Sequence, residues 1–581
     1  MLMGTAAVAL AFAVGWHTTR SSVALWILVV SIHNRNLLLC DVGDALLAAA
    51  LFWCMFLPLG ARFSVDAALR RRDAGGDEDH RHVSAASLAL IALVFLFSFV
   101  SASSRSGREW NDGTALYYAL SLDSHATAIG AFVLRWPAAT HVLTPLFVWL
   151  EWSVALGAIS PVFNAPLRIV AVVSSFALHV GFGILLELGM WVWVPPAVSL
   201  CLLPPMAWTW WRRSVQTRIA AFRVLYNPRR RGLRSAVLIA RELLLLGDLL
   251  RVEPAAAPSF DLAVEDAGDK DHQSTIVRDV DAVLSVARAS PVCDVLWIVP
   301  LGDAIVRCVL RTRVVAWLRA CWLGDDELAD ADDTAPLASL SARAPPRQQQ
   351  PLLLRSLTAT WRDAVKLAFY WLSGRSLLRE SFVLCMLAAT LLSAAPRELH
   401  SWPVTLTAVS WVRFARLEPR YRVMAPTVSR DDGWVALNGA RVDGLKVNVW
   451  TDELNRGRGV GWLVGSVAAW LSGVPESCCE ASSNARTALS RPRIISQQFG
   501  GVMRWRNAWR HYQTREYERT RLQLAQFLCR LWNQRQRDAR KLLASFEIVW
   551  MSEVTLPSYH VRVIDQVPLW AHECVVVDGH Q

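Results

Sequence analysis

The segment VSAASLALIALVFLFSFVSASS, residues 83–104, is the strongest indication of fold in the chain, because its 22 residues carry no charged side chain. An apolar helix of about 20 residues is long enough to cross the hydrocarbon core of a bilayer. His80, Arg81 and His82 precede the segment, and Arg105 follows it. The segment therefore predicts a helix that spans a membrane.

Comparable apolar runs recur before residue 212, and they predict about seven helices in residues 1–211. The longer runs are 45–61, 142–160, 169–186 and 188–211, and the shorter ones are 1–16 and 21–32. Residues 1–16 lack the basic start and the cleavage site of a signal peptide, so we expect a membrane helix there. The fold class predicted for this part is an α-helical multi-pass membrane bundle.

Arginine-rich loops predict how this bundle is oriented. Residues 61–83 carry several arginines, and residues 212–235 are strongly basic. Four predicted crossings separate the two stretches, which places them on one side. Positive loops favour the cytoplasmic side. The exit segment SSRSGREWNDGTALYYAL, residues 103–120, is then expected on the lumenal or exterior side. The sequence does not distinguish an endomembrane such as the endoplasmic reticulum from the plasma membrane.

The remaining chain divides by composition. Residues 221–322 mix apolar and charged runs, which suits a small α/β domain, and residues 325–351 read as a disordered linker. Apolar helices in residues 355–412 are expected to lie in the membrane or at its surface. Residues 413–581 predict a small α+β region, with hairpin turns at Asn438-Gly439 and Asp443-Gly444.

Ten arginines interleaved with aromatic residues predict basic amphipathic helices in residues 504–541. Such a surface can bind nucleic acid. A membrane-tethered nucleic-acid binder is nevertheless the least favoured of our hypotheses. In a chain anchored in a membrane, a basic helix has a simpler partner in anionic lipid headgroups. We therefore expect the bilayer and its anionic headgroups, and no nucleic acid, as partners.

The spacing of the cysteines argues against two kinds of site, and lysines are rare in the chain. The 11 cysteines include no C-x-x-C pair, so we expect neither a structural metal site nor a dithiol active site. Most cysteines are expected to be small buried apolar residues. The chain has only four lysines, and none occurs before Lys270.

Ionisable side chains within the apolar runs are the candidates for function. Such groups are costly in lipid, so they should face one another or a polar cavity. Glu151, His179 and Asp123 are the candidate catalytic residues. Arg105, Trp110, Tyr117, Tyr118 and His33 are the candidate ligand-binding residues. The alternative is that Glu151 and His179 form a hydrogen-bonded pair that only holds two helices together.

Three stretches of the first 191 residues resemble the HTTM family, the membrane domain related to vitamin K-dependent gamma-carboxylase. They are residues 30–69, the stretch EWNDGTALYYALSLDSHATAIGAFVL (109–134) and the stretch PLRIVAVVSSFALHVGFGILLELGMW (166–191). The stretches 418–450 and 504–535 are similar to the C-terminal part that accompanies this domain. The family has a further helix before the position of Met1, so the resemblance implies an N-terminally truncated sequence.

The resemblance implies a lysine base just before the tryptophan of the exit segment, used in oxygenating reduced vitamin K. Arg105 occupies that position in this chain. Arginine keeps its proton at neutral pH and cannot act as that base. A fixed cation could still hold an anionic headgroup or a carboxylate.

Residues 222–237, FRVLYNPRRRGLRSAV, resemble the start of the DCC thiol-disulfide oxidoreductase domain that some HTTM proteins carry. The two cysteine positions of its D-G-x-C-x-x-C motif correspond here to Arg230 and Leu233. Thiol exchange requires both sulfur atoms. The resemblance therefore implies a degenerate thioredoxin-like segment.

These observations favour a multi-pass membrane protein of the HTTM type that lacks carboxylase activity and acts in binding, lipid contact or scaffolding. The alternative is a membrane enzyme related to the carboxylase and epoxidase, acting on a quinone-like or lipid substrate through His179, Glu151 and Asp123, with Arg105 as an anion clamp. We expect no cofactor, although a quinone or a lipid could be the ligand. Arg105 is expected at the polar rim of a cavity that Trp110 and the two tyrosines line.

Overall fold

The chain separates into two compact units that each combine distant parts of the sequence. Unit 1 comprises Met1–Val29, Leu51–Ala89 and Pro204–Ala388, and unit 2 comprises Val30–Ala50, Leu90–Leu203 and Ala389–Gln581. The computed structural model describes residues 1–36, 39–70, 84–219, 222–228, 233–246, 250–255, 262–266, 275–278, 286, 374–394, 403–417, 424–449, 509, 517–534, 536–556 and 561–574.

The described residues are mostly helical, with two small sheets. The helices are α1 (Leu2–Ala13), α2 (Thr18–Arg35), α3 (Val42–Cys54), α4 (Val65–Arg70), α5 (Ala85–Ser104), α6 (Arg108–Asn111), α7 (Ala115–Ser121), α8 (Ala128–Val133), α9 (Pro137–Ile159), α10 (Asn164–Leu185), α11 (Val194–Ser199), α12 (Pro205–Ile219), α13 (Leu233–Leu243), α19 (Gly374–Ala394), α20 (Pro403–Phe414) and α24 (Glu518–Asn533), with short 3-10 turns η2 (Leu59–Ala61), η3 (Gly189–Val192), η4 (Leu200–Leu202) and η13 (Ala539–Lys541).

Three of the described helices, α5, α9 and α10, are long and apolar enough to cross a membrane. They contain 20, 23 and 22 residues, which matches about 30 Å of hydrocarbon at 1.5 Å per residue. A fourth span is reached if the broken pair Gly189–Leu202 and Pro205–Thr217 counts as one. The seven spans that we expected are not confirmed, because α1 and α3 have only 12 and 13 residues.

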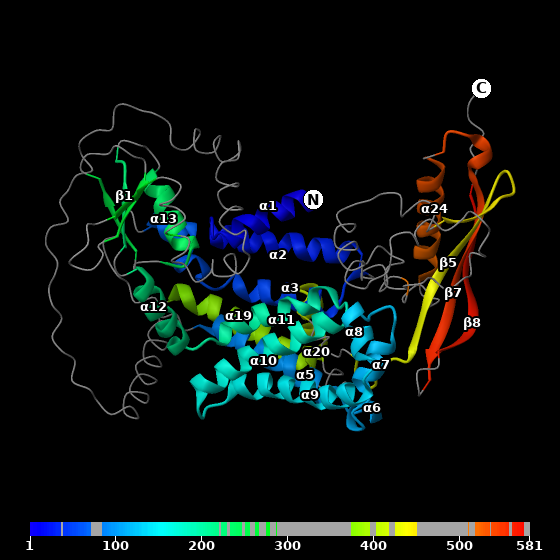
Figure 1. Ribbon diagram of the computed structural model, residues 1–581, viewed down its shortest axis with the longest axis horizontal. Coiled ribbons are helices and arrows are strands. Elements are labelled where there is room, and N and C mark those ends of the chain that lie inside the picture. Colours follow the sequence, from blue (N-terminus) through cyan, green and yellow to red (C-terminus); the bar gives the residue numbers. More distant parts are fainter. Residues whose placement is uncertain are drawn as a thin grey trace. The chain divides into compact units, whose positions relative to one another are not determined.

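Helices α9 and α10 pack closely against each other (Figure 1). A side-chain carbon at Gly157 would lie only 2.6 Å from the Leu167 carbonyl oxygen and 2.9 Å from Ala171. The absence of a side chain there lets the two backbones approach, as small residues do in membrane helix pairs. Val94 of α5 joins Val154, Ala171 and Val172 in the core beside this contact.

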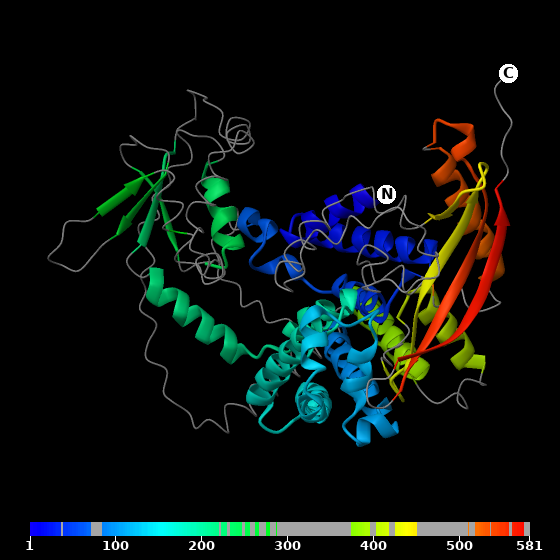
Figure 2. The ribbon, with the colours of Figure 1, turned by 45° about the vertical axis from the view of Figure 1, so that its right-hand side comes forward.

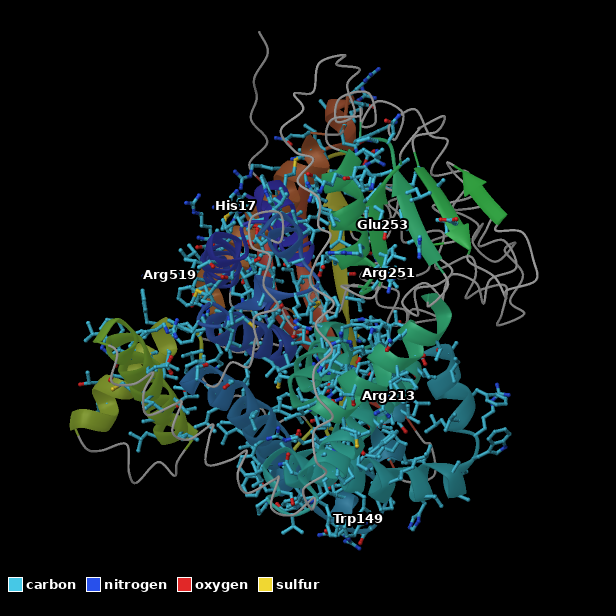
Figure 3. All side chains as sticks on the ribbon, turned by 90° about the vertical axis from the view of Figure 1, so that its left-hand side faces the viewer. His17, Trp149, Arg213, Arg251, Glu253 and Arg519 are labelled. Atoms are coloured by element: carbon cyan, nitrogen blue, oxygen red, sulfur yellow. A yellow bond between two sulfur atoms is a disulfide. The ribbon has the colours of Figure 1, made fainter. Side chains whose placement is uncertain are left out.

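Large apolar side chains cover the outward faces of α9 and α10. Trp149 is 72% exposed, and Val142, Leu156, Val173 and Ile184 are exposed as well. Figure 3 shows Trp149 pointing away from its helix into open space. An apolar surface of this extent on a helix pair fits contact with lipid better than contact with water.

A mixed four-stranded sheet follows in unit 1. Its strands are β1 (Phe222–Tyr226), β2 (Arg251–Pro254), β3 (Leu262–Asp266) and β4 (Thr275–Arg278), in the order β2-β1-β3-β4. β1 and β2 are parallel and are joined through α13, whereas β3 is antiparallel to both β1 and β4. The parallel pair, the helix between its strands and the antiparallel strands all lie within residues 221–322, for which a small α/β domain was expected.

An antiparallel sheet near the C-terminus has the order β6-β5-β7-β8. Its strands are β5 (Asp431–Arg441), β6 (Lys446–Asn448), β7 (Leu543–Thr555) and β8 (Val561–Glu573). Helix α24 lies along one face of this sheet (Figures 1 and 2), where Leu528 and Trp532 pack with Leu437 and Ile548. Cys529 of α24 forms a disulfide with Cys574, directly after β8.

Two expectations for this region need correction. Asn438-Gly439 is not a turn, because β5 runs straight through it; a side-chain carbon at Gly439 would lie 2.7 Å from Leu543 and Val449, so the glycine serves close packing inside the sheet. The turn lies at Asp443-Gly444, where Gly444 adopts a positive φ of 81°. Cys529 and Cys574 are disulfide-bonded rather than free apolar residues.

Several expected segments fall outside the described residues. The linker expected at 325–351 lies there, as does most of 286–373. Of the apolar helices expected in residues 355–412, the structure describes α19 and α20. Of the basic helices expected in residues 504–541, it describes α24.

Candidate functional site

The exit segment begins where α5 ends, and two glycines shape it. Gly107 precedes the short helix α6, and Gly113, with a positive φ of 73°, separates α6 from α7. A side-chain carbon at Gly113 would lie 3.1 Å from the His141 ring, so both the backbone conformation and the available space require glycine there. This short path turns Arg105 and Trp110 toward each other.

Arg105 and Glu151 form a closed ion pair inside unit 2. The Arg105 Nη1 atom lies 3.0 Å from Glu151 Oε2, and Nη2 donates to Oε1 at 3.2 Å. Both side chains are only 2% exposed. Burial lowers the pKa of Arg105 below its ordinary value, and the Glu151 carboxylate opposes this shift. A guanidinium is so strongly basic that it keeps its proton in this setting. The pair thus joins the end of α5 to the middle of α9.

The Trp110 indole covers the guanidinium. The Arg105 Cζ atom lies 4.5 Å from the centre of the Trp110 ring, within range of a cation–π interaction. The indole Nε1–H donates to the Met424 carbonyl oxygen at 3.0 Å. A backbone group more than 300 residues away in sequence therefore fixes the ring that shields Arg105.

His179 of α10 is also buried, with 2% of its surface exposed. Its Nδ1 atom lies 2.8 Å from the Ser175 carbonyl oxygen, so Nδ1 carries the proton and Nε2 is the acceptor. Among the described residues, Nε2 has no hydrogen-bond partner. The rings of Phe97 and Trp191 lie 6.1 and 5.8 Å away. The imidazole therefore sits between two aromatic rings with one unused acceptor.

The alternative of a Glu151–His179 hydrogen-bonded pair is not what the structure shows. Glu151 takes Arg105 as its partner, and His179 bonds within its own helix. A guanidinium offers two donors in the geometry of a carboxylate, which makes it the better partner for Glu151. We call Arg105, Trp110, Glu151 and His179 the interior cluster.

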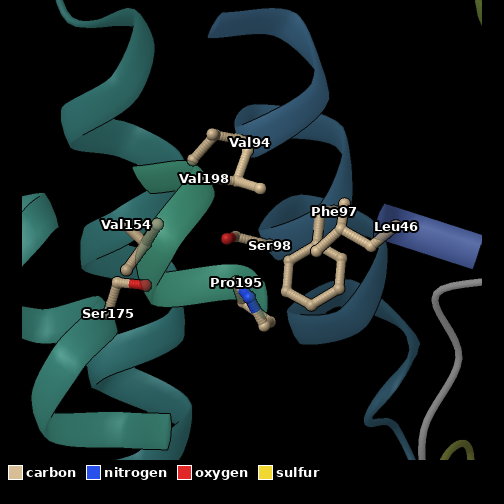
Figure 4. A pocket seen from close by; sticks show the side chains of 8 residues that line it. All are labelled: Leu46, Val94, Phe97, Ser98, Val154, Ser175, Pro195 and Val198. Atoms are coloured by element: carbon tan, nitrogen blue, oxygen red, sulfur yellow. The ribbon is translucent and has the colours of Figure 1, made fainter. Parts of the chain in front are cut away.

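A cavity of about 10 Å³ is lined in part by Phe97 and Ser175 (Figure 4). Both residues contact His179. The cavity is bounded by α3, α5, α9, α10 and α11, and the hydroxyl-bearing residues Ser98 and Ser175 are among those lining it. A volume near 10 Å³ holds about one water molecule, whereas pockets for organic ligands measure some 300–1,000 Å³. This cavity is too small for a quinone.

The two tyrosines lie in α7, and both are buried. Arg430 lies over the Tyr118 ring at 4.4 Å, and its guanidinium pairs with Glu109 at 2.9 Å. The residues around Arg430 make further contacts with the exit segment, since Gly107 N–H donates to the Pro426 carbonyl at 2.9 Å. We call residues 424–432 the strap.

The structure brings together some of the predicted site residues and separates others. Arg105, Trp110, Glu151 and His179 meet in the interior cluster, with Tyr117 and Tyr118 in the neighbouring helix α7. His33 lies apart, 3.5 Å from Asp44 at the start of α3. Asp123 is exposed in the turn after α7, whereas Glu151 and His179 are buried.

We expected Arg105 at the polar rim of a cavity, but it does not lie there. Its side chain is enclosed because Glu151 neutralises it and Trp110 covers it. The strap residues Met424, Pro426 and Arg430 were not among the predicted site residues. No local pattern identifies them, because their role depends on contacts across about three hundred residues of sequence.

Among the described residues, no group of three or more His, Cys, Asp or Glu side chains is placed to hold a metal ion. A comparison of the chain with protein-family models finds no match, and comparisons with curated proteins and with solved structures find none either.

Proposed function

We propose that this chain is a multi-pass integral membrane protein of the HTTM type that acts by binding, lipid contact or scaffolding, without carboxylase activity. One observation carries this proposal: the cation at the position of the expected base is closed off by Glu151 and Trp110. The stretches that resemble the family, 109–134 and 166–191, contain Trp110 and His179.

Charge chemistry argues against a carboxylase mechanism of the known type. A base must release its proton, and a guanidinium paired with a carboxylate keeps it. The buried pair has a simpler use in joining the end of α5 to α9. Breaking such a pair leaves an unpaired buried charge, so it fixes one arrangement of the helices.

The disulfide supports an orientation for the protein. Disulfides persist in oxidising compartments, so the sheet carrying Cys529–Cys574 belongs in the endoplasmic reticulum lumen or outside the cell. The strap leads directly into β5 of that sheet and contacts the exit segment. The exit segment then shares this compartment, which agrees with the orientation expected from the arginine-rich loops.

The proposal is tested on detergent-purified protein by mass spectrometry of the small molecules that it retains. We expect bilayer phospholipids and no stoichiometric quinone, with the same result for Arg105→Ala and for the control Arg108→Ala. Arg108 is the matched control because it lies three residues away with its side chain 89% exposed. Vitamin K epoxidation by the unaltered protein would contradict the proposal.

The second candidate, an enzyme acting on a quinone-like or lipid substrate, is favoured by the unused Nε2 acceptor of His179 between Phe97 and Trp191. An imidazole acceptor between aromatic rings suits a hydroxyl-bearing ring compound, provided that the interior cluster opens. A quinone retained in stoichiometric amount, lost in His179→Phe and in Arg105→Ala but kept in Arg108→Ala, would establish this candidate and overturn the first.

A further inference from the structure

The short helix α8 is fastened to the end of α10. The Thr127 hydroxyl caps α8 by accepting from the Gly130 N–H at 3.0 Å, and it donates to the Ile184 carbonyl oxygen at 2.6 Å. A side-chain carbon at Gly130 would collide with the Leu185 carbonyl oxygen, so the two backbones touch there. One side of α8 is therefore buried against α10, and the other side faces outward.

The outward side of α8, together with the turn that follows it, is apolar. Ile129 is 54%, Phe132 49% and Trp136 56% exposed. Ala128 and Ala131 are the smaller exposed residues of the helix, and α8 itself contains no polar side chain. A helix in water normally turns a polar face outward, so this surface is suited to an apolar surrounding.

Arg135 adds a positive charge to the edge of this surface. Its Cζ atom lies 5.9 Å from the centre of the Phe132 ring, and the centres of the Phe132 and Trp136 rings are 4.8 Å apart. Arg135 is exposed, and within the described parts of the chain it has no carboxylate partner. A guanidinium beside two aromatic rings can thus offer its donors to an anion outside the protein.

The length of α9 gives the depth of this surface in a bilayer. Helix α9 begins at Pro137, directly after Trp136, and its 23 residues rise about 34 Å. Apolar side chains are exposed along it from Val142 to Ile159. Because α9 alone matches a hydrocarbon core about 30 Å thick, its first residue lies near the boundary between acyl chains and headgroups. Tryptophan is enriched at that boundary, and arginine reaches the headgroups there.

From these observations we infer that α8 is an interfacial helix: Ile129, Phe132 and Trp136 lie between the headgroups and the acyl chains of one leaflet, and Arg135 binds a phospholipid phosphate. The inference rests on the proposed membrane location and names the lipid group that is bound. A helix that lies in the interface needs no crossing of its own. Because α8 is fastened to α10, the phosphate contact also fixes the depth of the α9–α10 pair.

The depth of α8 is tested with nitroxide labels on single cysteines, in a variant in which every cysteine except Cys529 and Cys574 is replaced by serine. The labels are placed at Ile129→Cys and Phe132→Cys, with Trp149→Cys in the middle of α9 as the hydrocarbon reference and Ser429→Cys in the strap as the aqueous reference. The protein is held in vesicles of phosphatidylcholine and phosphatidylglycerol. We expect the ratio of collisions with oxygen to collisions with a water-soluble nickel complex to lie, for both α8 labels, between the two references.

The references separate this inference from the proposed function. A Trp149→Cys label in lipid, with α8 labels as accessible to nickel as the Ser429→Cys label, would overturn the interfacial helix alone. Labels on α8 that match the Trp149→Cys label, or that another protein copy shields from both reagents, would overturn it too. A Trp149→Cys label that is itself accessible to nickel would overturn the membrane location and the interfacial helix together.

The phosphate contact is tested with a fluorescent bimane label at Ala131→Cys, which leaves Phe132 and Arg135 in place. The labelled protein in maltoside detergent is titrated with dioctanoyl phosphatidylglycerol. We expect saturable binding that Arg135→Gln weakens about fivefold, the loss expected for one basic side chain near an anionic lipid surface. The matched control is Arg108→Gln, another exposed arginine of the exit segment, which should leave the affinity unchanged.

Two further titrations identify the group that Arg135 binds. Dioctanoylglycerol has the same acyl chains without a phosphate, so its binding should not depend on Arg135, and inorganic phosphate alone should give no saturable change. Equal affinity of the Arg135→Gln and unaltered proteins for phosphatidylglycerol, or equal weakening by Arg108→Gln, would overturn the phosphate contact. Inorganic phosphate that binds as tightly as the lipid would show a site for a free anion and would overturn the lipid as ligand.

Discussion

The two ends of α5 each meet a buried carboxylate, but they use it in different ways. At the start of the helix, Glu380 accepts from the Ala85 backbone N–H, and its ion-pair partner Arg379 is 38% exposed. At the end, Glu151 pairs with Arg105, and both side chains are only 2% exposed. Glu380 thus binds the N-terminus of a helix and a partly exposed arginine, whereas Glu151 binds a buried arginine side chain.

This difference predicts where substitutions will be tolerated. The helix dipole and a partly solvated arginine share the charge of Glu380, so its loss can be partly compensated. The charge of Arg105 depends on Glu151, because the enclosed site offers no water to replace it. We therefore expect the end of α5 to be the more sensitive of the two.

The largest effect is expected for Glu151→Ala, which leaves the Arg105 guanidinium buried and unpaired. Losing one partner of such a pair costs about 3–5 kcal/mol of unfolding free energy. The measurement is reversible unfolding in mixed micelles. The matched control is the double substitution Arg105→Met with Glu151→Leu, which removes both charges and should recover most of the loss; a double variant as unstable as Glu151→Ala would show that packing rather than charge dominates.

A smaller effect is expected for Glu380→Ala, because it removes one hydrogen bond to the first turn of α5 and leaves the Ala85 N–H unsatisfied. An unsatisfied buried donor costs about 1–3 kcal/mol. The same unfolding assay measures it, with Arg108→Ala as a control on an exposed side chain. A loss equal to that of Glu151→Ala would remove the distinction between the two ends.

Arg105→Lys keeps the positive charge but replaces a two-pronged donor with a single ammonium. We expect a loss of about 1–2 kcal/mol, from one hydrogen bond and part of the stacking on Trp110. Faster hydrogen exchange at residues 105–111 should accompany it. Stability equal to that of the unaltered protein would mean that charge alone, and not the hydrogen bond from Nη2 or the stacking on Trp110, holds this end of α5.

The smallest effect is expected at the strap, for Arg430→Ala. The Arg430 side chain is 41% exposed, and partly exposed ion pairs and cation–π contacts each contribute at most about 1 kcal/mol. The clearer readout is hydrogen exchange in residues 107–124, which should become faster while α9 and α10 are unchanged. Faster hydrogen exchange at the backbone amide of Glu151 as well would indicate that the strap also stabilises the interior cluster.

The apolar runs of the sequence locate the helices well, because a bilayer requires length and low polarity that few other structures share. The run at residues 83–104 corresponds to α5, and the runs around Glu151 and His179 correspond to α9 and α10. The runs do not give the number of spans, since α1 and α3 are helical but short. Helix formation and membrane crossing are separate properties, and only the first follows from an apolar run.

Partners across long sequence distances could not be predicted. The sequence suggests His179 as a partner of Glu151, whereas the structure pairs Glu151 with Arg105, directly after the end of α5. No local pattern in the sequence identifies β7 as the strand that pairs with β5. The Cys529–Cys574 disulfide likewise spans 45 residues with no motif.

The bond from Trp110 to the Met424 carbonyl has a consequence for the timing of biosynthesis. Its two ends are 314 residues apart in the chain. At about 5–20 residues per second, a ribosome needs roughly 15 to 60 s after making Trp110 before the strap emerges. During that interval the indole lacks its final acceptor, although α5, α9 and α10 have already been synthesised. A nascent chain stalled before residue 424 should therefore expose Arg105 to an arginine-selective reagent that the finished protein excludes.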